Sequence, residues 1–534
     1  FCTFVRTYVF GVVSLTITFI SKMFILVVLF IIVCYFYGTR TFGYWKKKGV
    51  KHDPPLPFFG NNFKQFVQRA SMCMMATETY KKYPGERVVG FYRGTKPELV
   101  IRDTDLIKRI LITDFNNFYA RGFIPHKTDI EPLLQNLFFA DGDTWRLIRQ
   151  RFTPTFSTAK LKAMFPIITE RAAKLQVLAE DIVNKDFYDI RELMARYTTD
   201  FIGACGFGLN VDALSDENSQ FRWLGKRIFQ RTPRDAINGA LKLMFPELCK
   251  KLTFLSPELE KSVVSLVTSI MKERNYKPAG KNDFIDLVLE IKQKGKISGE
   301  SIEQKSPDGS PKIVELEISD LLIIAQVFVF FGAGFETSST ASSYTLHQLA
   351  FNPDCQEKAQ EEIDRVLAKY GNKLTYEAIN DLKYLEMCFF EGMRMYPSVG
   401  YLVRMCTTPH YTFSEIDLTI DEGVKVYIPI QAINRDEKFF PNPNKFDPER
   451  FRDGIKDVKD FFLPFGSGPR ACVGERLGQM QSMAGIAALL HKYSVEPAAC
   501  SVLDPPPEPS GIVSESFVGG LPLKLKKRHH KVSS

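Results

Sequence analysis

A glycine-rich segment that carries one cysteine and leads into a helical pattern constrains this chain more than any other feature. Residues 465–474 read FGSGPRACVG, and apolar positions at helical spacing follow from about residue 475 to residue 493. Glycines let the backbone turn and bring amides close to a side chain. A cysteine at a helix N-terminus has its thiolate favoured by the helix dipole and by free N–H groups. This arrangement suits a loop that presents the Cys472 thiolate; the alternative is a structural cysteine beside a turn.

A long helix is predicted over about residues 319–352, and its middle contains two glycines. Mid-helix glycine costs about 1 kcal/mol relative to alanine, so Gly332 and Gly334 need a reason. They favour either the close approach of a bulky group or a close helix crossing. Glu336 and Thr337, which follow, form an acid–alcohol pair that can deliver protons. The alternative is a Thr337 hydroxyl that bonds back along its own helix.

Charged pairs mark two further helical segments. Glu391 and Arg394 are three residues apart in an apolar stretch, so both lie on one helix face. Arg450 follows about 55 residues later, within the segment PERF. Trp145 and Arg149 lie one helical turn apart, although a Trp–Arg stack is also common on surface helices.

Taken together, these motifs resemble the cytochrome P450 superfamily, over about residues 23–527 and in the family's order. Residues 465–474 match its haem-binding signature in full: Phe, two residues, Gly, one residue, Arg, one residue, Cys, one residue, Gly. Residues 333–338 are similar to its oxygen-activation motif. Residues 153–157, 330–339 and 442–451 resemble insect microsomal members that metabolise foreign compounds.

The resemblance implies the mainly α cytochrome P450 fold with a minor β part, and haem b (iron protoporphyrin IX) as cofactor. Cys472 is the implied axial ligand of the iron; in cytochromes P450 such a thiolate supplies electron density that favours O–O cleavage. The other implied cofactor-binding residues are Trp145, Arg149, Arg404, Phe465, Arg470 and Gly474.

Further roles follow from the same family match. Thr337 and Glu336 are expected to guide protons. A structural network is expected among Glu391, Arg394 and Arg450. By family position only, the substrate pocket is expected to be lined by Phe330, Phe331, Ala333, Val399, Leu402 and Phe517.

The implied activity is that of a monooxygenase of the unspecific type. One oxygen atom of O2 enters a small apolar substrate, and the electrons come from NADPH through NADPH–cytochrome P450 reductase, with cytochrome b5 as a second candidate partner. The expected role is detoxification of foreign compounds. The alternatives are biosynthesis of an endogenous lipid or hormone, a thiolate-haem isomerase or dehydratase, and a membrane haem protein without turnover. The intact Glu336–Thr337 pair argues against the isomerase and dehydratase.

An apolar run over residues 8–37, interrupted by Lys22, predicts attachment to a membrane. Met23 to Tyr44 is 22 residues, close to the ~20 that a bilayer span needs. Aromatic residues up to Trp45 are expected at the membrane interface, and the lysines that follow indicate a cytoplasmic flank. With the resemblance, this predicts the endoplasmic reticulum membrane and a catalytic domain that faces the cytosol. A cleaved signal peptide is the alternative, although no small-residue cleavage site follows the run.

The expected organisation has four parts. Residues 1–22 are interpreted as a non-native or upstream extension, residues 23–45 as the transmembrane anchor, residues 46–61 as a basic, Pro-rich linker, and residues 62–534 as the catalytic domain.

Charge, cysteines and short patterns complete the predictions. The net charge of +9 is scattered, which argues against nucleic acid as a partner. The basic residues around Arg146, Arg149 and Arg151 suit an acidic reductase face. The 10 cysteines are irregularly spaced, which indicates reduced thiols. Strands are expected at 87–92, 98–101 and 425–428, and a polar surface loop at 295–313.

Overall fold

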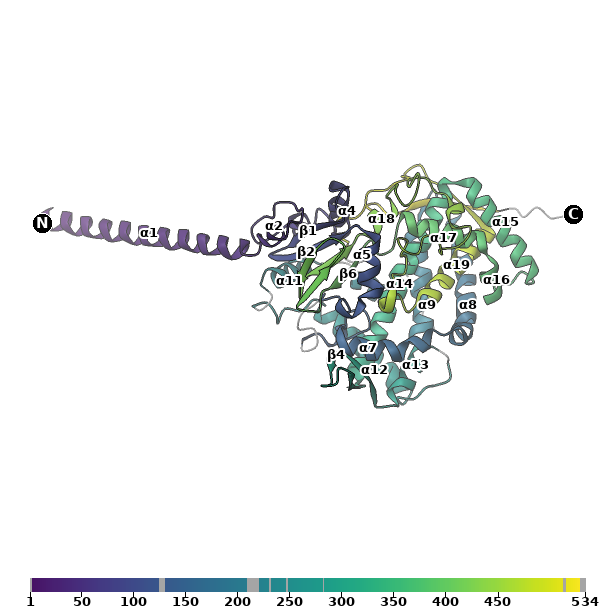
Figure 1. Ribbon diagram of the computed structural model, residues 1–534. Coiled ribbons are helices and arrows are strands. Elements are labelled where there is room, and N and C mark those ends of the chain that lie inside the picture. Colours follow the sequence, from purple (N-terminus) through teal and green to yellow (C-terminus); the bar gives the residue numbers. More distant parts are fainter. Residues whose placement is uncertain are drawn as a thin grey trace.

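The computed structural model describes residues 2–123, 130–208, 220–229, 232–245, 248–281, 283–511 and 515–528. One long helix projects from a mainly helical body, and a small sheet lies where this helix meets the body (Figure 1). The predicted mainly α fold with a minor β part is confirmed.

The helices of the described residues are α1 (Cys2–Thr39), α2 (Tyr44–Lys47), α3 (Phe63–Phe66), α4 (Met72–Lys82), α5 (Thr104–Lys108), α7 (Gly142–Phe152), α8 (Thr158–Ile182), α9 (Ile190–Phe207), α10 (Gln220–Phe229), α11 (Pro233–Met244), α12 (Pro257–Glu273), α13 (Phe284–Lys292), α14 (Asp320–Phe351), α15 (Pro353–Lys369), α16 (Tyr376–Asp381), α17 (Lys383–Met395), α18 (Ile430–Asn434) and α19 (Glu475–Lys492). The strands are β1 (Val88–Arg93), β2 (Lys96–Ile101), β3 (Tyr188–Asp189), β4 (Lys296–Lys305), β5 (Pro311–Glu317), β6 (Leu402–Met405), β7 (His410–Phe413), β8 (Leu418–Asp421), β9 (Lys425–Ile428), β10 (Tyr493–Pro497) and β11 (Pro522–Lys527).

The long helix α14 runs through the centre of the body. Its N-cap is Ser319, whose hydroxyl accepts a hydrogen bond from the Leu322 N–H at 3.1 Å. Most of its residues are buried, as expected for a helix that is apolar on nearly all sides. It packs against α9, α17 and α19, so three other helices are positioned relative to it. The sequence predicted this helix at 319–352, and the structure confirms it.

The largest sheet has the strand order β1-β2-β9-β6. β1 and β2 form an antiparallel hairpin, β9 joins β2 in parallel, and β6 pairs with β9 in antiparallel register. The three predicted strands correspond to β1, β2 and β9. Trp45 lies against this sheet with its side chain fully buried, and its Nε1–H donates to the Phe91 carbonyl oxygen at 3.0 Å. The expectation that Trp45 lies at the membrane interface is therefore wrong, because the indole packs over Gly90, where no side chain intervenes.

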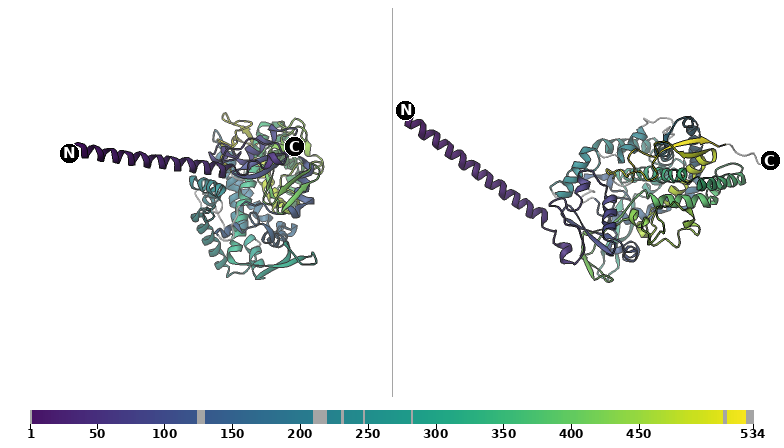
Figure 2. Two further views of the ribbon diagram at one scale, coloured as in Figure 1. Left: turned by 60° about the vertical axis from the view of Figure 1, so that its left-hand side comes forward. Right: turned by 90° about the horizontal axis from the view of Figure 1, so that it is seen from above.

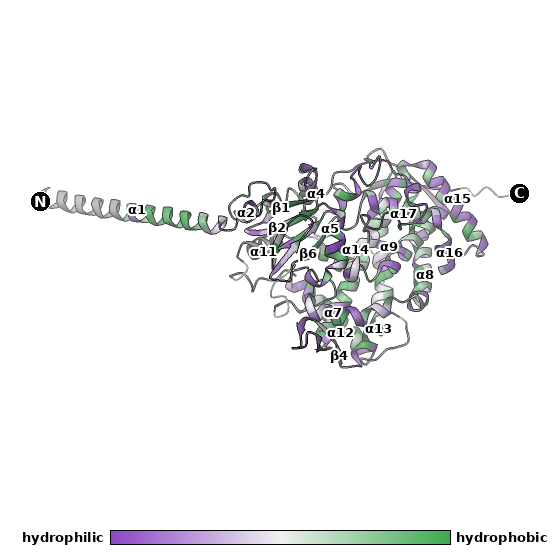
Figure 3. Ribbon diagram, viewed as in Figure 1, coloured by the Kyte–Doolittle hydropathy of each residue, from purple (hydrophilic) through white to green (hydrophobic). Residues whose placement is uncertain are grey.

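The projecting helix α1 has an apolar stretch, Phe19–Thr39, that is long and apolar enough to cross a membrane. The ribbon of this stretch projects from the body and is coloured hydrophobic (Figure 3), and the side chains of residues 19–33 are exposed. The helix ends at Thr39, before the predicted anchor boundary at residue 45. α14 passes the same length and composition test, but it is mostly buried and belongs to the core.

Residues 296–317 form a hairpin of β4 and β5, so the predicted surface loop at 295–313 is wrong. Lys296 pairs with Glu317 and Glu300 with Ile313 in antiparallel register. The hairpin packs against α7, where the Ser301 hydroxyl donates to the Asp143 carboxylate at 2.7 Å. The strands β4 and β5 form although they are polar in composition, because alternate residues face α7.

Candidate functional site

The Cys472 loop is closed by hydrogen bonds within it. The Cys472 N–H donates to the Phe465 carbonyl oxygen at 2.8 Å, and the loop runs directly into α19. Gly468 has φ +73°, and a Cβ there would overlap the Leu111 carbonyl oxygen, so this position accepts only glycine. Burial raises the pKa of the Cys472 thiol, while a hydrogen bond from the Gly474 N–H lowers it. The loop therefore aims one backbone donor at the sulfur.

Accessible surface inside the body marks the space in front of this loop. Cys472 is accessible although its surroundings desolvate it enough to raise its pKa. Ala333 is exposed in the middle of the otherwise buried helix α14, and Val329 and Thr337 are half-buried. These three residues are four positions apart, so they form one stripe on the helix. The stripe and the sulfur thus both keep surface that no side chain covers.

Arg470 and Arg149 hold the loop to its neighbours. The Arg470 guanidinium lies 4.3 Å from the ring centroid of Trp145 and donates to Asp141 at 3.0 Å. Its Nη1 is buried without a hydrogen-bond partner. Arg149 donates to the carbonyl oxygen of Ala471, the residue before Cys472, at 2.8 Å.

Arg404 and Arg121 bring further positive charge to the same place. Arg404 is fully buried and its Nε lacks a hydrogen-bond partner. Burial lowers the pKa of Arg404 to about 9, and the neighbouring Arg121 guanidinium contributes. Burial likewise lowers the pKa of Arg121 to about 10, with Asp141 opposing the shift. Arg121, Arg404 and Arg470 thus share one nearby carboxylate, Asp141, and Arg149 adds a fourth guanidinium group beside them.

This arrangement fits a bound group that carries two carboxylates beside a thiolate ligand. Buried guanidinium donors without partners are costly unless a charged acceptor completes them. Haem has two propionates, which the guanidinium groups would hold, and its iron takes a thiolate ligand, which the accessible Cys472 would supply. The residues present therefore fit haem. Sequence reasoning missed Arg121, because it lies outside every motif.

Glu336 and Thr337 take different partners. Glu336 is buried and forms an ion pair with Arg191 of α9, with Nη2 and Oε1 2.5 Å apart. The Thr337 hydroxyl donates to the Ala333 carbonyl oxygen at 2.7 Å, which is the back-bonded arrangement left open by the sequence. The Ser398 hydroxyl donates to the Thr337 carbonyl oxygen at 3.0 Å.

Glu391, Arg394 and Arg450 are brought together by α17 and the PERF segment. Arg394 donates to both carboxylate oxygens of Glu391, at 2.7 and 2.8 Å, and both side chains are fully buried. Arg450 Nε lies 3.4 Å from Glu391 Oε1. The Asp447 N–H also donates to Glu391, so the network fixes the segment that leads towards the Cys472 loop.

The predicted pocket residues separate into two groups. Phe330 and Phe331 are buried in the core: Phe330 stacks on Phe284 at 4.0 Å, and Phe331 packs against Phe207 at 5.6 Å. They do not share the accessible stripe, because helix rotation places Val329 there. Of the others, Ala333 is on the stripe and Val399, Leu402 and Phe517 are half-buried.

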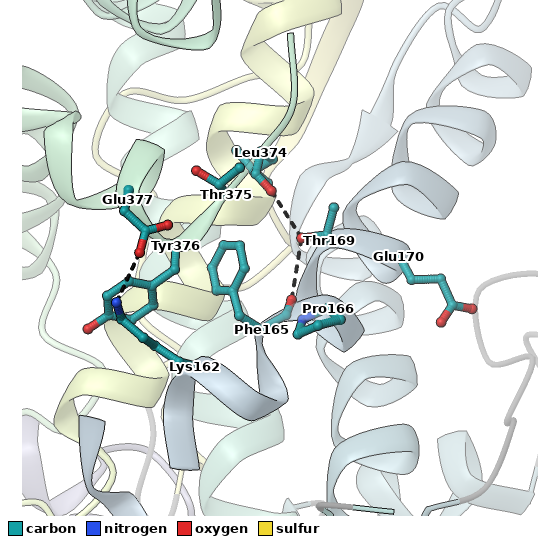
Figure 4. A pocket seen from close by; sticks show the side chains of 9 residues that line it. All are labelled: Lys162, Phe165, Pro166, Thr169, Glu170, Leu374, Thr375, Tyr376 and Glu377. Carbon is teal, nitrogen blue, oxygen red and sulfur yellow. Dashed lines mark hydrogen bonds and ion pairs between the residues drawn. The ribbon is translucent and has the colours of Figure 1, made fainter. Parts of the chain in front are cut away.

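A separate depression of about 660 Å³ lies on the outer surface between α8 and α16 (Figure 4). Its wall is closed by an ion pair of Lys162 with Glu377 and by the Thr169 hydroxyl, which donates to the Leu374 carbonyl oxygen. It contains none of the predicted site residues. The remaining lining residues are Phe165, Pro166, Glu170, Thr375 and Tyr376.

Comparison with known proteins agrees with this geometry. Residues 51–517 match the family model described as Cytochrome P450. Cytochrome P450 6B2 of Helicoverpa armigera is 39% identical over 473 residues, which cover 88% of this chain and 91% of that protein. Cytochrome P450 6a2 of Drosophila melanogaster is 37% identical over 521 residues, 95% of this chain and 100% of its own length. Cytochrome P450 6B1 of Papilio polyxenes is 37% identical over 476 residues, 87% and 91% of the two chains.

Proposed function

Because this chain belongs to the cytochrome P450 family, and is therefore a monooxygenase of a haem-binding family, we propose that it inserts one oxygen atom of O2 into small apolar compounds, and that its role is detoxification of foreign compounds. The observation that carries the proposal is the convergence of four guanidinium groups, two of them with unpaired buried donors, beside the Cys472 loop. The resemblance of residues 153–157, 330–339 and 442–451 to insect microsomal members supports the detoxification role, and the relatives reported above are insect cytochromes P450. When bound, haem supplies the iron centre that activates O2.

The residues of the Cys472 loop are proposed to hold the thiolate and the cofactor. The Gly474 N–H donates to the sulfur and favours its anionic form. Arg149 fixes the Ala471 carbonyl and so the position of the sulfur. Arg470, Arg404 and Arg121 are proposed to bind the two propionates, because a guanidinium fork fits a carboxylate.

Proton handling is proposed to centre on the Thr337 oxygen. Thr337 lies on the accessible stripe, and its hydroxyl can accept a hydrogen bond from a bound ligand while it donates to Ala333. Glu336 is held by Arg191, so it can carry a proton only after it leaves that ion pair. In the proposed order, Glu336 leaves Arg191 and takes up a proton, the Thr337 hydroxyl turns from Ala333 and gives its own proton to the bound ligand, and Glu336 then returns a proton to the Thr337 oxygen.

The proposed electron source is NADPH, through NADPH–cytochrome P450 reductase, with cytochrome b5 as a second donor. The arginines of α7, Arg146, Arg149 and Arg151, were expected to form a basic docking surface for the reductase. Two of them are already engaged by other groups of the chain. Arg146 pairs with Glu300 at 3.2 Å and Arg149 with Ala471, which leaves the exposed Arg151 for an acidic partner. The proposed location is the endoplasmic reticulum membrane, with α1 as anchor and the catalytic domain in the cytosol.

A change of the proposed ligand tests the function. Cys472→Ser should abolish the red-shifted Soret band of the ferrous–CO form and with it the O2-dependent product formed from an apolar substrate in the presence of reductase and NADPH. Cys500→Ser, which changes another exposed cysteine, should leave both unchanged. A thiolate-type band that persists in Cys472→Ser would show that another cysteine is the ligand. A normal band in the native protein without any turnover would favour a haem protein that only binds.

A further inference from the structure

Glu515 lies where three other parts of the chain meet: the segment around Ser398, helix α14 and helix α4. Its backbone N–H donates to the Ser398 carbonyl oxygen at 3.2 Å, and its carbonyl oxygen accepts from the Tyr344 hydroxyl of α14 at 2.6 Å. Its carboxyl group is hydrogen-bonded to the Cys73 thiol of α4. The backbone hydrogen bonds and the contact with Cys73 together hold the Glu515 carboxyl group in place.

The carboxyl group lies directly against the segment 398–402. A Cβ on Gly400 would stand only 3.2 Å from Glu515 Oε1. The same segment bonds to the accessible stripe of α14 through Ser398 and Thr337. At its other end, Leu402 would lie 4.0 Å from a Cβ on Gly466 of the Cys472 loop. Glu515 therefore lies beside the segment 398–402, a wall that contacts both Thr337 and the Cys472 loop.

Glu515 has no cation to balance it within the described part of the chain. No described lysine, arginine or histidine lies within ion-pair distance of its carboxyl group. Arg191, which influences the neighbouring Tyr344, is committed to Glu336. Glu515 as a whole residue is half-buried, and the burial of its carboxyl group raises the pKa of that group. A carboxylate in such a place is costly unless a positive charge joins it.

We propose that Glu515 recognises the protonated nitrogen of amine substrates, whose apolar part then extends along Val399 and Leu402 towards Thr337. This inference rests on the proposed monooxygenase function and narrows its substrate class. The ammonium group supplies the missing cation, and the apolar wall binds the hydrocarbon part without directional demands. Such a site distinguishes an amine from a neutral compound of the same shape, which an apolar wall alone cannot do.

Amine binding at this site depends on pH. The ammonium stabilises ionised Glu515, so affinity rises with pH through the raised pKa of the carboxyl group and falls again where the amine itself loses its proton. The other titratable groups at the site are the Cys73 thiol of α4 and the Tyr344 hydroxyl of α14, and burial raises the pKa of both. The Arg191–Glu336 pair and Tyr396 lie near Tyr344. The Cys73 thiol and the Tyr344 hydroxyl therefore keep their protons over the pH range in which Glu515 ionises, so the ionisation of Glu515 sets the pH dependence of amine binding.

A matched pair of ligands tests the proposal: N,N-dimethyl-4-phenylbutylamine and its hydrocarbon isostere, in which carbon replaces nitrogen. Both are titrated into the haem-loaded full-length protein, and Kd is read from the Soret shift. Glu515→Gln keeps the shape and removes the charge, so it should weaken binding of the amine about ten-fold or more, which is about 1.4 kcal/mol. The isostere should change less than about two-fold, and the rise of amine affinity with pH should disappear.

Glu496→Gln is the control, because Glu496 pairs with Lys526 on the nearby sheet and stands outside the wall. It should leave both ligands unaffected. Equal weakening of both ligands in Glu515→Gln would overturn the proposal, as would unchanged amine binding. Failure of the monooxygenase function is seen separately, as absence of oxidised product from either ligand in the native protein despite normal Kd values.

Discussion

Thr337 keeps its hydroxyl hydrogen on the Ala333 carbonyl oxygen, at 2.7 Å, while its oxygen stays accessible. Thr337→Ala should therefore preserve the helix and the binding of haem and substrate, but misdirect protons. We expect the ratio of product to NADPH consumed to fall on the order of ten-fold, with peroxide in place of product. Thr337→Ser restores the hydroxyl and should restore most of the ratio. An unchanged ratio in Thr337→Ala would reduce Thr337 to a packing residue.

Glu391 balances two arginines in the interior. Glu391→Gln leaves Arg394 fully buried without its carboxylate, so we expect a loss of about 3–5 kcal/mol in the free energy of unfolding. Denaturant unfolding followed by circular dichroism measures it. Glu449→Gln removes the partner of the exposed Arg452 and should cost less than about 1 kcal/mol. Equal effects of the two changes would contradict a structural role for the buried network.

Single residues were predictable from sequence where a motif carries them. The spacing of residues 465–474 predicted roles for Cys472 and Arg470, which stay predictions, and the i, i+3 spacing placed Glu391 against Arg394, as the structure shows. Arg121 has no such signal, because only the folded chain brings it beside Arg404. Phe330 and Phe331 were chosen by family position, whereas the rotation of α14 turns both into the core. The four-residue spacing from Ala333 and Thr337 leads back to Val329, so helical periodicity was the unused signal.

Among the elements, the β4–β5 hairpin depends on a few polar contacts with α7. Asp143 accepts from the Ser301 hydroxyl at 2.7 Å and from the Ile302 N–H at 2.7 Å. Asp143→Ala removes both acceptors, so the hairpin should detach more often. We expect hydrogen exchange of the amides in residues 296–305 to speed up about ten-fold, which corresponds to about 1.4 kcal/mol. Asp308 at the hairpin turn makes only local hydrogen bonds, so Asp308→Ala should leave these exchange rates unchanged. An equal increase in Asp308→Ala would show that Asp143 does not hold the hairpin on α7.

The helices α14 and α19 were predictable to within a few residues because apolar periodicity and caps act locally. Ser319 caps α14 and Pro353 begins the next helix, so both ends of α14 were readable from the chain. The hairpin was not, since its strands are rich in Gly, Ser and charged residues that usually mark loops. Its stability comes from α7, more than 140 residues earlier in the chain, and no local pattern reports that contact.

For the whole molecule, Trp45 joins the base of the projecting helix to the sheet. Trp45→Ala would empty a fully buried site and remove the hydrogen bond to Phe91, so we expect a loss of about 3–5 kcal/mol in the free energy of unfolding of the body. Circular dichroism during denaturation measures this loss. Phe36→Ala, on the exposed surface of α1, is the matched aromatic control and should leave the body unaffected. A similarly small effect of Trp45→Ala would mean that the base of the helix is not part of the folded body.

The burial of Trp45 also limits the distance between the body and its proposed membrane anchor, α1. Only residues 40–43 separate the end of α1 from α2, a reach of about 14 Å even when fully extended. The Phe58 N–H, which donates to the Gly38 carbonyl oxygen, shortens the tether further. Figure 2 shows that the body begins directly at the end of α1. If α1 lies in a bilayer, as proposed, the body therefore begins where the helix emerges from the membrane. Apolar compounds partition into lipid, so their concentration in the membrane exceeds that in the surrounding water. An enzyme held this close to the bilayer therefore meets its substrates at the higher concentration.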